Sequence, residues 1–278
     1  MAKAANKESA GGATRLVSHL AKVFRERERL TQKELGAMLG YSAAAISALE
    51  TGAQPASDEM LIKLEAVIGD GLGVFEVARE LVLLDKYPSQ FKDYAMLEQR
   101  AVSISSYVTL VIDGLFQTEA YARALIGGGY PPLSDQRIDE LVAARMARQA
   151  LLDRAPLPHI ELVIEESVLH RVVGNRTVMR EQLLHLISCA RRRNVTLQVL
   201  ALDRGACGEH AGMRGDMKLV ETEDHKHLLY VEPQDESLLI SDAAKVSSYT
   251  RRYAKILAQA LSPDESLALI ERLAGESE

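Results

Sequence analysis

The stretch from Thr31 to Gly52 reads TQKELGAMLGYSAAAISALETG, and its spacing predicts two short helices joined by a tight turn. Thr31 and Glu34 have the spacing of a capping box, in which each side chain accepts a hydrogen bond from the other residue's backbone N–H. The first helix should therefore begin at Gln32. Gly40 should end it, because glycine readily adopts the left-handed conformation that follows many helix C-termini.

The second helix of this stretch should begin after Ser42, whose hydroxyl is a favoured N-cap, and should turn Ile46 and Leu49 inward. Gly36 falls where the two helices are expected to cross, and only a small side chain fits at such a crossing. Glycine inside a helix costs about 1 kcal/mol of helix propensity relative to alanine. We therefore expect a packing reason for Gly36.

Three more helices are predicted around this pair, which gives a mainly α N-terminal domain of five helices over residues 14–84. In the first, apolar residues recur at i, i+4, i+7 and i+8 from Leu16, as they do on one face of an amphipathic helix. The other two begin at Ser57, a further N-cap residue, and at Val74. Residues 1–13 are small and polar, and we expect them to form a disordered tail.

Residues 85–96 are expected to form a linker, and a different pattern follows it over residues 97–278. Helical and strand-like segments are interspersed there, so we predict an α+β C-terminal domain. Residues 102–112 are rich in β-branched side chains and fit either a strand or a helix. The other expected helices are 117–125, 135–152, 178–192, 243–261 and 263–273, and the expected strands are 159–164, 195–200, 218–221, 228–232 and 238–240.

Charge is unevenly distributed along the chain. Residues 1–55 carry eight Lys/Arg and five Asp/Glu, a net charge of +3, whereas residues 56–278 carry 25 and 34, a net charge of −9. A basic head on an acidic body is typical of a protein whose N-terminal domain binds nucleic acid. A surplus of three charges also falls within ordinary variation, so charge alone does not decide the function.

The sequence shows no sign of membrane insertion or secretion. No stretch approaches the run of about 18 apolar residues that a transmembrane helix needs, and the first residues lack the apolar core of a secretory signal. Cys189 and Cys207 are the only cysteines, and two unclustered thiols indicate a reducing compartment rather than a disulfide framework. We expect a cytoplasmic protein that does not associate with membranes.

The positions of Gln32, Gly36, Gly40, Ile46 and Leu49 resemble the helix-turn-helix of the phage-repressor or xenobiotic-response-element type. The resemblance implies that double-stranded DNA is the partner and that the helix after the turn enters the major groove. It also implies that Gln32 binds a phosphate. Proteins of this type often act as dimers on paired half-sites, and we expect a homodimer.

The same resemblance assigns roles to residues around the helix pair. Arg25 and Glu50 match a structural ion pair of the family, and Lys33 stands beside the phosphate-binding Gln32. Ser42 and Ser47 are short hydrogen-bond donors near the groove. These contacts position a protein on the DNA backbone but carry little sequence information.

The positions that would face the bases hold Ala43, Ala44 and Ala48. Alanine cannot hydrogen-bond a base edge and can only contact a thymine methyl, and each missing bidentate contact forgoes roughly 1–3 kcal/mol of discrimination. Two interpretations remain open. Either the domain binds DNA with weak direct readout of bases, or it has kept the helix-turn-helix fold and lost the ability to recognise DNA.

From about residue 97 the chain resembles the C-terminal domain, of unknown function, of actinobacterial antitoxin-like helix-turn-helix regulators. The resemblance implies a transcriptional regulator that is often encoded beside a small partner protein. The segments that carry it are GLFQT (114–118), YARA (121–124), RMARQALL (145–152), EESVL (165–169), VMREQL (178–183), NVTLQVL (194–200), YVE (230–232) and LSPDES (261–266).

No catalytic or metal-binding motif is predicted. His225 and His227 would share one face of a strand, but no third ligand has suitable spacing, so surface histidines are expected. Cys207 and His210 lie in a Gly-containing loop without a residue that would orient a base for catalysis. We expect no enzymatic activity, no metal and no cofactor.

These patterns together predict a DNA-binding transcriptional regulator, associated with the nucleoid when bound, whose activity is controlled through the C-terminal domain. The alternative is an antitoxin-like interaction protein with a degenerate DNA-binding head that neutralises a small partner protein encoded by a neighbouring gene.

Overall fold

The computed structural model describes residues 12–54, 56–84, 92–205, 210–232 and 237–276. The chain divides into two compact units, Met1–Lys92 and Asp93–Glu278. The first is a helical helix-turn-helix region and the second combines a six-stranded sheet with helices, which confirms the predicted fold class. Among the described helices, none has the length and apolar character needed to cross a membrane.

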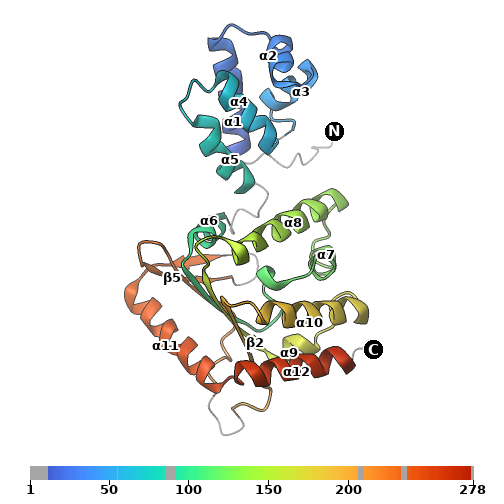
Figure 1. The fold of residues 1–278 in the computed structure, drawn as a ribbon, viewed down its shortest axis with the longest axis vertical. Helices are drawn as coiled ribbons and strands as arrows, with labels where there is room; N and C mark the ends of the chain where they lie inside the picture. The colour runs from blue at the N-terminus through green and yellow to red at the C-terminus, as the bar shows by residue number, and fades with distance from the viewer. Residues whose placement is uncertain (1–11, 55, 85–91, 206–209, 233–236, 277–278) are drawn as a thin grey trace, which may run out of the picture. The chain divides into compact units, whose positions relative to one another are not determined.

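The described part of the N-terminal unit forms five helices around one mainly aliphatic core (Figure 1). Side chains from every helix enter this core, among them Val17, Leu35, Ile46, Leu64 and Phe75. The helices are α1 (Gly12–Arg27), α2 (Gln32–Leu39), α3 (Ala43–Glu50), α4 (Asp58–Ile68) and α5 (Val74–Leu84).

The turn between α2 and α3 has the predicted geometry. The capping box is present, since Glu34 N donates to the Thr31 hydroxyl and Thr31 N donates to the Glu34 carboxylate. Gly40 has a φ of +78°, in the left-handed region. A Cβ on Gly36 would lie 2.6 Å from the carbonyl oxygen of Tyr41. This contact is the packing reason for Gly36: backbone of the turn fills the space where a side chain would be.

Two boundaries around the N-terminal unit differ from the prediction. Helix α1 begins at Gly12, so the expected tail loses its last two residues, and residues 1–11 lie outside the described part. The expected linker 85–96 is wrong in its second half, because helix α6 (Lys92–Arg100) begins there; residues 85–91 are not described. Helix α6 is anchored by Tyr94, which is buried and stacks on Tyr230 with ring centroids 4.1 Å apart.

A mixed six-stranded sheet forms the centre of the C-terminal unit, with strand order β3-β2-β1-β4-β5-β6. Strands β1, β2 and β3 are parallel, and β4, β5 and β6 continue the sheet in antiparallel fashion. The ambiguous segment 102–112 contains a strand, β1, at the middle of the sheet. The strands are β1 (Ser103–Val108), β2 (His159–Glu165), β3 (Val195–Leu200), β4 (Met217–Glu221), β5 (His227–Val231) and β6 (Leu238–Ile240).

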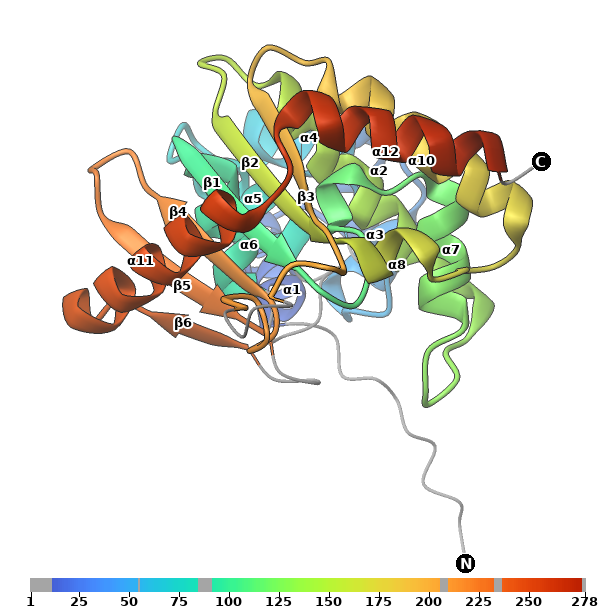
Figure 2. The same cartoon turned by 90° about the horizontal axis from the view of Figure 1, so that it is seen from below.

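Helices cover both faces of the sheet. Figures 1 and 2 show α11 along one face and α10 on the opposite side. Helix α9 was not predicted; it is a single short turn that directly follows strand β2. The helices of this unit after α6 are α7 (Glu119–Gly127), α8 (Asp135–Arg148), α9 (Glu166–His170), α10 (Arg176–Ala190), α11 (Ala243–Gln259) and α12 (Pro263–Glu276), with 3₁₀ turns at Gly114–Phe116 and Gln149–Asp153.

Buried charge pairs connect the helices to the sheet on the side of α6 and α8. The Arg148 guanidinium donates twice to the Glu98 carboxylate, each bond 2.7 Å, and these side chains are 8% and 2% exposed. Lys218 Nζ of β4 lies 2.5 Å from Asp113 Oδ2. Because removing one partner from a buried pair leaves an uncompensated charge, such pairs are costly to break. The first pair joins α8 to α6, and the second joins β4 to Asp113, the N-cap of the 3₁₀ turn at Gly114–Phe116.

We predict that Gly36→Ala destabilises the helix-turn-helix although alanine is the better helix former. The added Cβ meets backbone atoms of the turn, which cannot rotate away, and overpacking of this kind costs about 1–3 kcal/mol. Hydrogen–deuterium exchange of peptides from residues 31–52 should accelerate. Gly275→Ala in α12, where a Cβ would meet nothing within 4 Å, is the matched control and should not accelerate exchange. Unchanged exchange in Gly36→Ala would contradict the crossing geometry.

Candidate nucleic-acid interface

Side chains from two helices of the helix-turn-helix, α1 and α2, donate hydrogen bonds to one carboxylate at the end of a third, α3. Arg25 Nε of α1 lies 2.5 Å from Glu50 Oε1, and Arg25 Nη2 lies 3.1 Å from Glu50 Oε2. Gln32 Nε2, at the start of α2, donates to Glu50 Oε2 at 2.9 Å. Arg25 also donates to the Leu30 carbonyl at 2.6 Å. This network joins α1, α2 and the last residue of α3.

The network fixes the charge state of its members. The hydrogen bond to Glu50 raises the pKa of the Arg25 guanidinium. Burial alone would raise the pKa of the Glu50 carboxyl, but hydrogen bonds from Arg25 and Gln32 outweigh burial, and the pKa lies below its usual value. The Glu50 side chain is only 4% exposed, so it acts inside the scaffold and does not contact a ligand.

The predicted contact residues lie at the beginning of α2 and along α3. Lys33, Ser42, Ala43 and Ala44 are exposed, whereas Gln32, Ser47 and Ala48 are half-buried. The Ser42 hydroxyl accepts a hydrogen bond from Ala45 N at 3.1 Å, and its O–H can still donate. Gln32 uses one amide N–H for Glu50 and retains the second, because a primary amide carries two.

Backbone N–H groups add donors at both helix starts. The first residues of a helix have no intrahelical acceptor for their N–H groups. The side chains of Thr31 and Ser42 take only those of Glu34 and Ala45. The N–H groups of residues 32, 33, 43 and 44 are therefore available to an anion at the positive ends of two helix dipoles. The exposed side chains on α3 itself supply no donor, since Ala43 and Ala44 end at Cβ.

One cation near the turn was missed by sequence analysis. Lys63 of α4 lies with Nζ 5.1 Å from the centre of the Tyr41 ring and 2.7 Å from Glu59 Oε1. From the sequence, Lys63 and Glu59 form only an ordinary i,i+4 helix pair. No local pattern places that pair beside the α2–α3 turn, because the contact depends on how α4 packs.

The histidines and cysteines considered from the sequence do not form a metal or catalytic cluster in the described residues. His225 has a φ of +57° and lies in the turn before β5. Strand β5 begins only at His227, so His225 lies outside it. The expectation that the two histidines share a strand face is therefore wrong. Cys207 lies outside the described part. Within the described ranges, no three His, Cys, Asp or Glu side chains are grouped so as to hold a metal ion.

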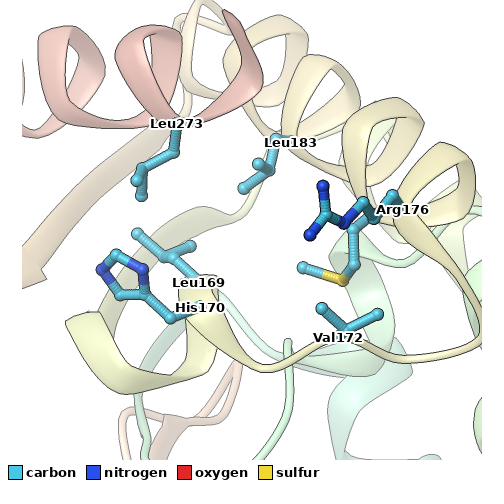
Figure 3. Close-up of a pocket in the computed structure, with 7 residues that line it drawn as sticks. Leu169, His170, Val172, Arg176, Leu183 and Leu273 are labelled. Atoms are coloured by element: carbon cyan, nitrogen blue, oxygen red, sulfur yellow. The ribbon is translucent and has the colours of Figure 1, made fainter. Parts of the chain in front are cut away.

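The C-terminal unit contains surface pockets of different character. One, of about 220 Å³, lies between α9, α10 and α12 and is lined by Leu169, His170, Val172, Arg176, Met179, Leu183 and Leu273. Figure 3 shows the Arg176 guanidinium directed into this space, opposite His170. A second pocket, of about 510 Å³, lies beside α11 and the start of β5 and has a mainly apolar lining.

We predict that Glu50→Gln weakens the helix-turn-helix in a pH-dependent manner. A carboxyl with a lowered folded-state pKa contributes stability that is present above its unfolded value, about 4.3, and is lost as pH falls through the folded-state pKa. At pH 7 the variant should lose about 1.5–3 kcal/mol, the usual range for a hydrogen bond to a charged group. Exchange of the α3 amides should be faster than in the parent at pH 7, and the difference should shrink towards pH 3. A difference that grows on acidification would contradict the network.

Comparison with known families identifies both units. Residues 22–69 match a helix-turn-helix family, which supports a DNA-binding regulator, and residues 91–272 match the Domain of unknown function (DUF5753). Neither a curated protein nor a solved structure matches the chain. The helix-turn-helix match is of the xenobiotic-response-element or phage-repressor type. Because the second match spans well over half of the 278 residues, the chain belongs to the DUF5753 family.

Proposed function

We propose that the protein is a transcriptional regulator that docks on the DNA phosphate backbone through its helix-turn-helix and reads the bases weakly. The observation that carries this proposal is the contrast along α2 and α3. Free backbone N–H groups, Lys33 and the spare amide hydrogen of Gln32 lie at the helix starts. The exposed positions of α3 that would face the bases hold Ala43 and Ala44.

Gln32 has a double role in this proposal. Its hydrogen bond to Glu50 fixes the direction of the amide, so a phosphate oxygen can accept the second N–H without the side chain first losing its freedom. The negative charge of Glu50 does not repel the phosphate strongly, because Arg25 neutralises it at 2.5 Å. Lys33 adds an exposed positive charge on the next residue.

Sequence preference should come from sources other than hydrogen bonds to base edges. Alanines at 43, 44 and 48 allow close approach to the groove floor and contact with thymine methyl groups. DNA shape and the spacing of two half-sites supply the remaining selectivity. We expect a homodimer for this reason, with the C-terminal unit controlling the activity. The proposed function is binding rather than catalysis, and it places the protein in the cytoplasm, at the nucleoid when bound.

An antitoxin-like interaction protein is the second candidate. The observation that favours it is that Gln32, the residue expected on phosphate, is engaged with Glu50, while the exposed α3 alanines offer no side-chain donors. In that case the helix-turn-helix is a scaffold only, and the main activity is binding of a small protein encoded by a neighbouring gene. The two candidates differ in whether the free protein binds any duplex.

The double variant Gln32→Ala, Lys33→Ala should separate the two candidates. For the regulator, duplex affinity falls, and the slope of log K against log salt becomes shallower by about 0.9, the value for one lost phosphate contact by a cation. Fluorescence anisotropy with a labelled duplex at several salt concentrations measures both. Lys245→Ala on α11 removes the same charge elsewhere and should leave both unchanged. Equal salt slopes for the parent and the double variant would favour the antitoxin-like interaction protein, in which the helix-turn-helix is only a scaffold.

Weak base readout predicts a small ratio between specific and non-specific affinity. Typical specific binders prefer their site by about 10³- to 10⁷-fold. We expect the best duplex selected from a random pool to fall at or below the lower end of that range against an unselected duplex, at the same salt concentration. A preference far above 10³-fold, lost on single base changes opposite α3, would show that bases are read directly.

A further inference from the structure

The pocket beside α11 combines an apolar floor with a rim of cations. Its lining includes Leu228, Ala243 and Val246 on the apolar side, and its volume of about 510 Å³ lies within the range of small-molecule sites, roughly 300–1,000 Å³. Val246 is buried and belongs to the core cluster that joins α11 to the sheet. The floor is therefore a fixed part of the fold and not a mobile surface.

Every ionisable side chain that lines this pocket is basic. They are Lys226, His227 and Arg251, and hydroxyls of Ser241, Ser247 and Thr250 complete the polar lining. This is unusual for the C-terminal unit, in which residues 93–278 carry 27 Asp/Glu against 21 Lys/Arg. Among the described residues, the lining carries no carboxylate, and such a set of side chains favours an anion over a cation.

Arg251 is the cation that a ligand would engage. Its only hydrogen bond within the described residues runs from Nη1 to the Ser247 hydroxyl at 2.7 Å, and no carboxylate pairs with it. Lys226, in contrast, lies 2.6 Å from Asp224. His227 lies on the same face of β5 as Leu229, two residues further on, and Leu229 packs in the cluster with Val246. A charged group at the rim can therefore reach Arg251 and His227.

Two other pockets formed by described residues fit such a ligand less well. The pocket in Figure 3 has about 220 Å³, below the usual range, and Arg176 itself enters it. A third pocket, of about 530 Å³ at the end of β3, is lined by three carboxylates and one cation, so an anion meets an excess of negative charge there. The carboxylates belong to Glu166, Asp203 and Glu265, and the cation is Arg272.

We propose that the pocket formed by α11 and the start of β5 binds a small carboxylate with an apolar chain. The carboxylate bonds the Arg251 guanidinium at the rim, as charge-assisted pairs with arginine do, and the chain covers Ala243 and Val246 of α11. This site goes beyond the proposed DNA-binding function and does not depend on it. Ligand binding and duplex binding can succeed or fail separately.

Isothermal titration calorimetry of the full chain with octanoate tests the proposal, with 1-octanol and octylammonium as neutral and cationic probes of equal length. Octanoate should bind saturably, octanol more weakly, and octylammonium not at all. Affinity should rise from hexanoate to octanoate, because each buried CH₂ adds up to about fourfold. No saturable octanoate binding, or equal binding of octylammonium, would overturn the proposal. If a second copy of this chain or a peptide covers the pocket instead, octanoate will show no saturable binding.

Paired variants locate the site. Ala243→Trp places an indole in the pocket and should abolish octanoate binding, whereas Ala244→Trp, on the adjacent exposed residue outside the lining, should not. Arg251→Gln should weaken octanoate about tenfold or more and leave octanol unchanged, while Arg252→Gln, whose guanidinium lies over the Tyr249 ring, should bind octanoate normally. Unchanged binding in both Ala243→Trp and Arg251→Gln would place the ligand elsewhere and contradict the proposal.

Discussion

The helix-turn-helix depends on a single carboxylate. Glu50 accepts hydrogen bonds from Arg25 and Gln32, so the end of α3 is tied to α1 and to the start of α2. Helix α3 has only eight residues and would be marginal alone, since short helices are stabilised mainly by tertiary packing. Ile46 and Leu49 supply that packing. The Glu50 network fixes the orientation of α3 relative to α1 and α2.

This arrangement explains how the unit can present a DNA-binding surface while its recognition helix is almost featureless. The donors at the helix starts belong to backbone amides and to Gln32, Lys33 and Ser42. The helix starts set the directions of the amides, and Glu50 sets that of the Gln32 amide. Such donors suit phosphate oxygens, which repeat regularly along DNA. They do not suit the varied edges of bases. The proposed docking on the DNA backbone rests on this geometry, and the proposal limits direct readout to contacts of the methyl groups of Ala43, Ala44 and Ala48.

Local signals in the sequence were sufficient for much of the fold. The capping box at Thr31, the glycines at 36 and 40, and strands β3 and β6 could be predicted because each depends on residues a few positions apart. Helix α6 could not, because this polar segment joins the core through long-range contacts such as the stack of Tyr94 on Tyr230. The order of the sheet, the buried Glu98–Arg148 pair and the position of Lys63 beside the turn likewise depend on tertiary packing. The pocket beside α11 had no local signal, since its lining comes from a β-turn, a strand and a helix.

The most direct test of phosphate docking is an NMR titration of the backbone amides with a duplex of arbitrary sequence at low salt. We expect the amide resonances of residues 32, 33, 43 and 44 to shift together and to return on addition of salt, while those buried in the α3–α4 core move little. If the protein binds the duplex and these four resonances do not move, or if no duplex causes any shift, docking through the two helix starts is contradicted.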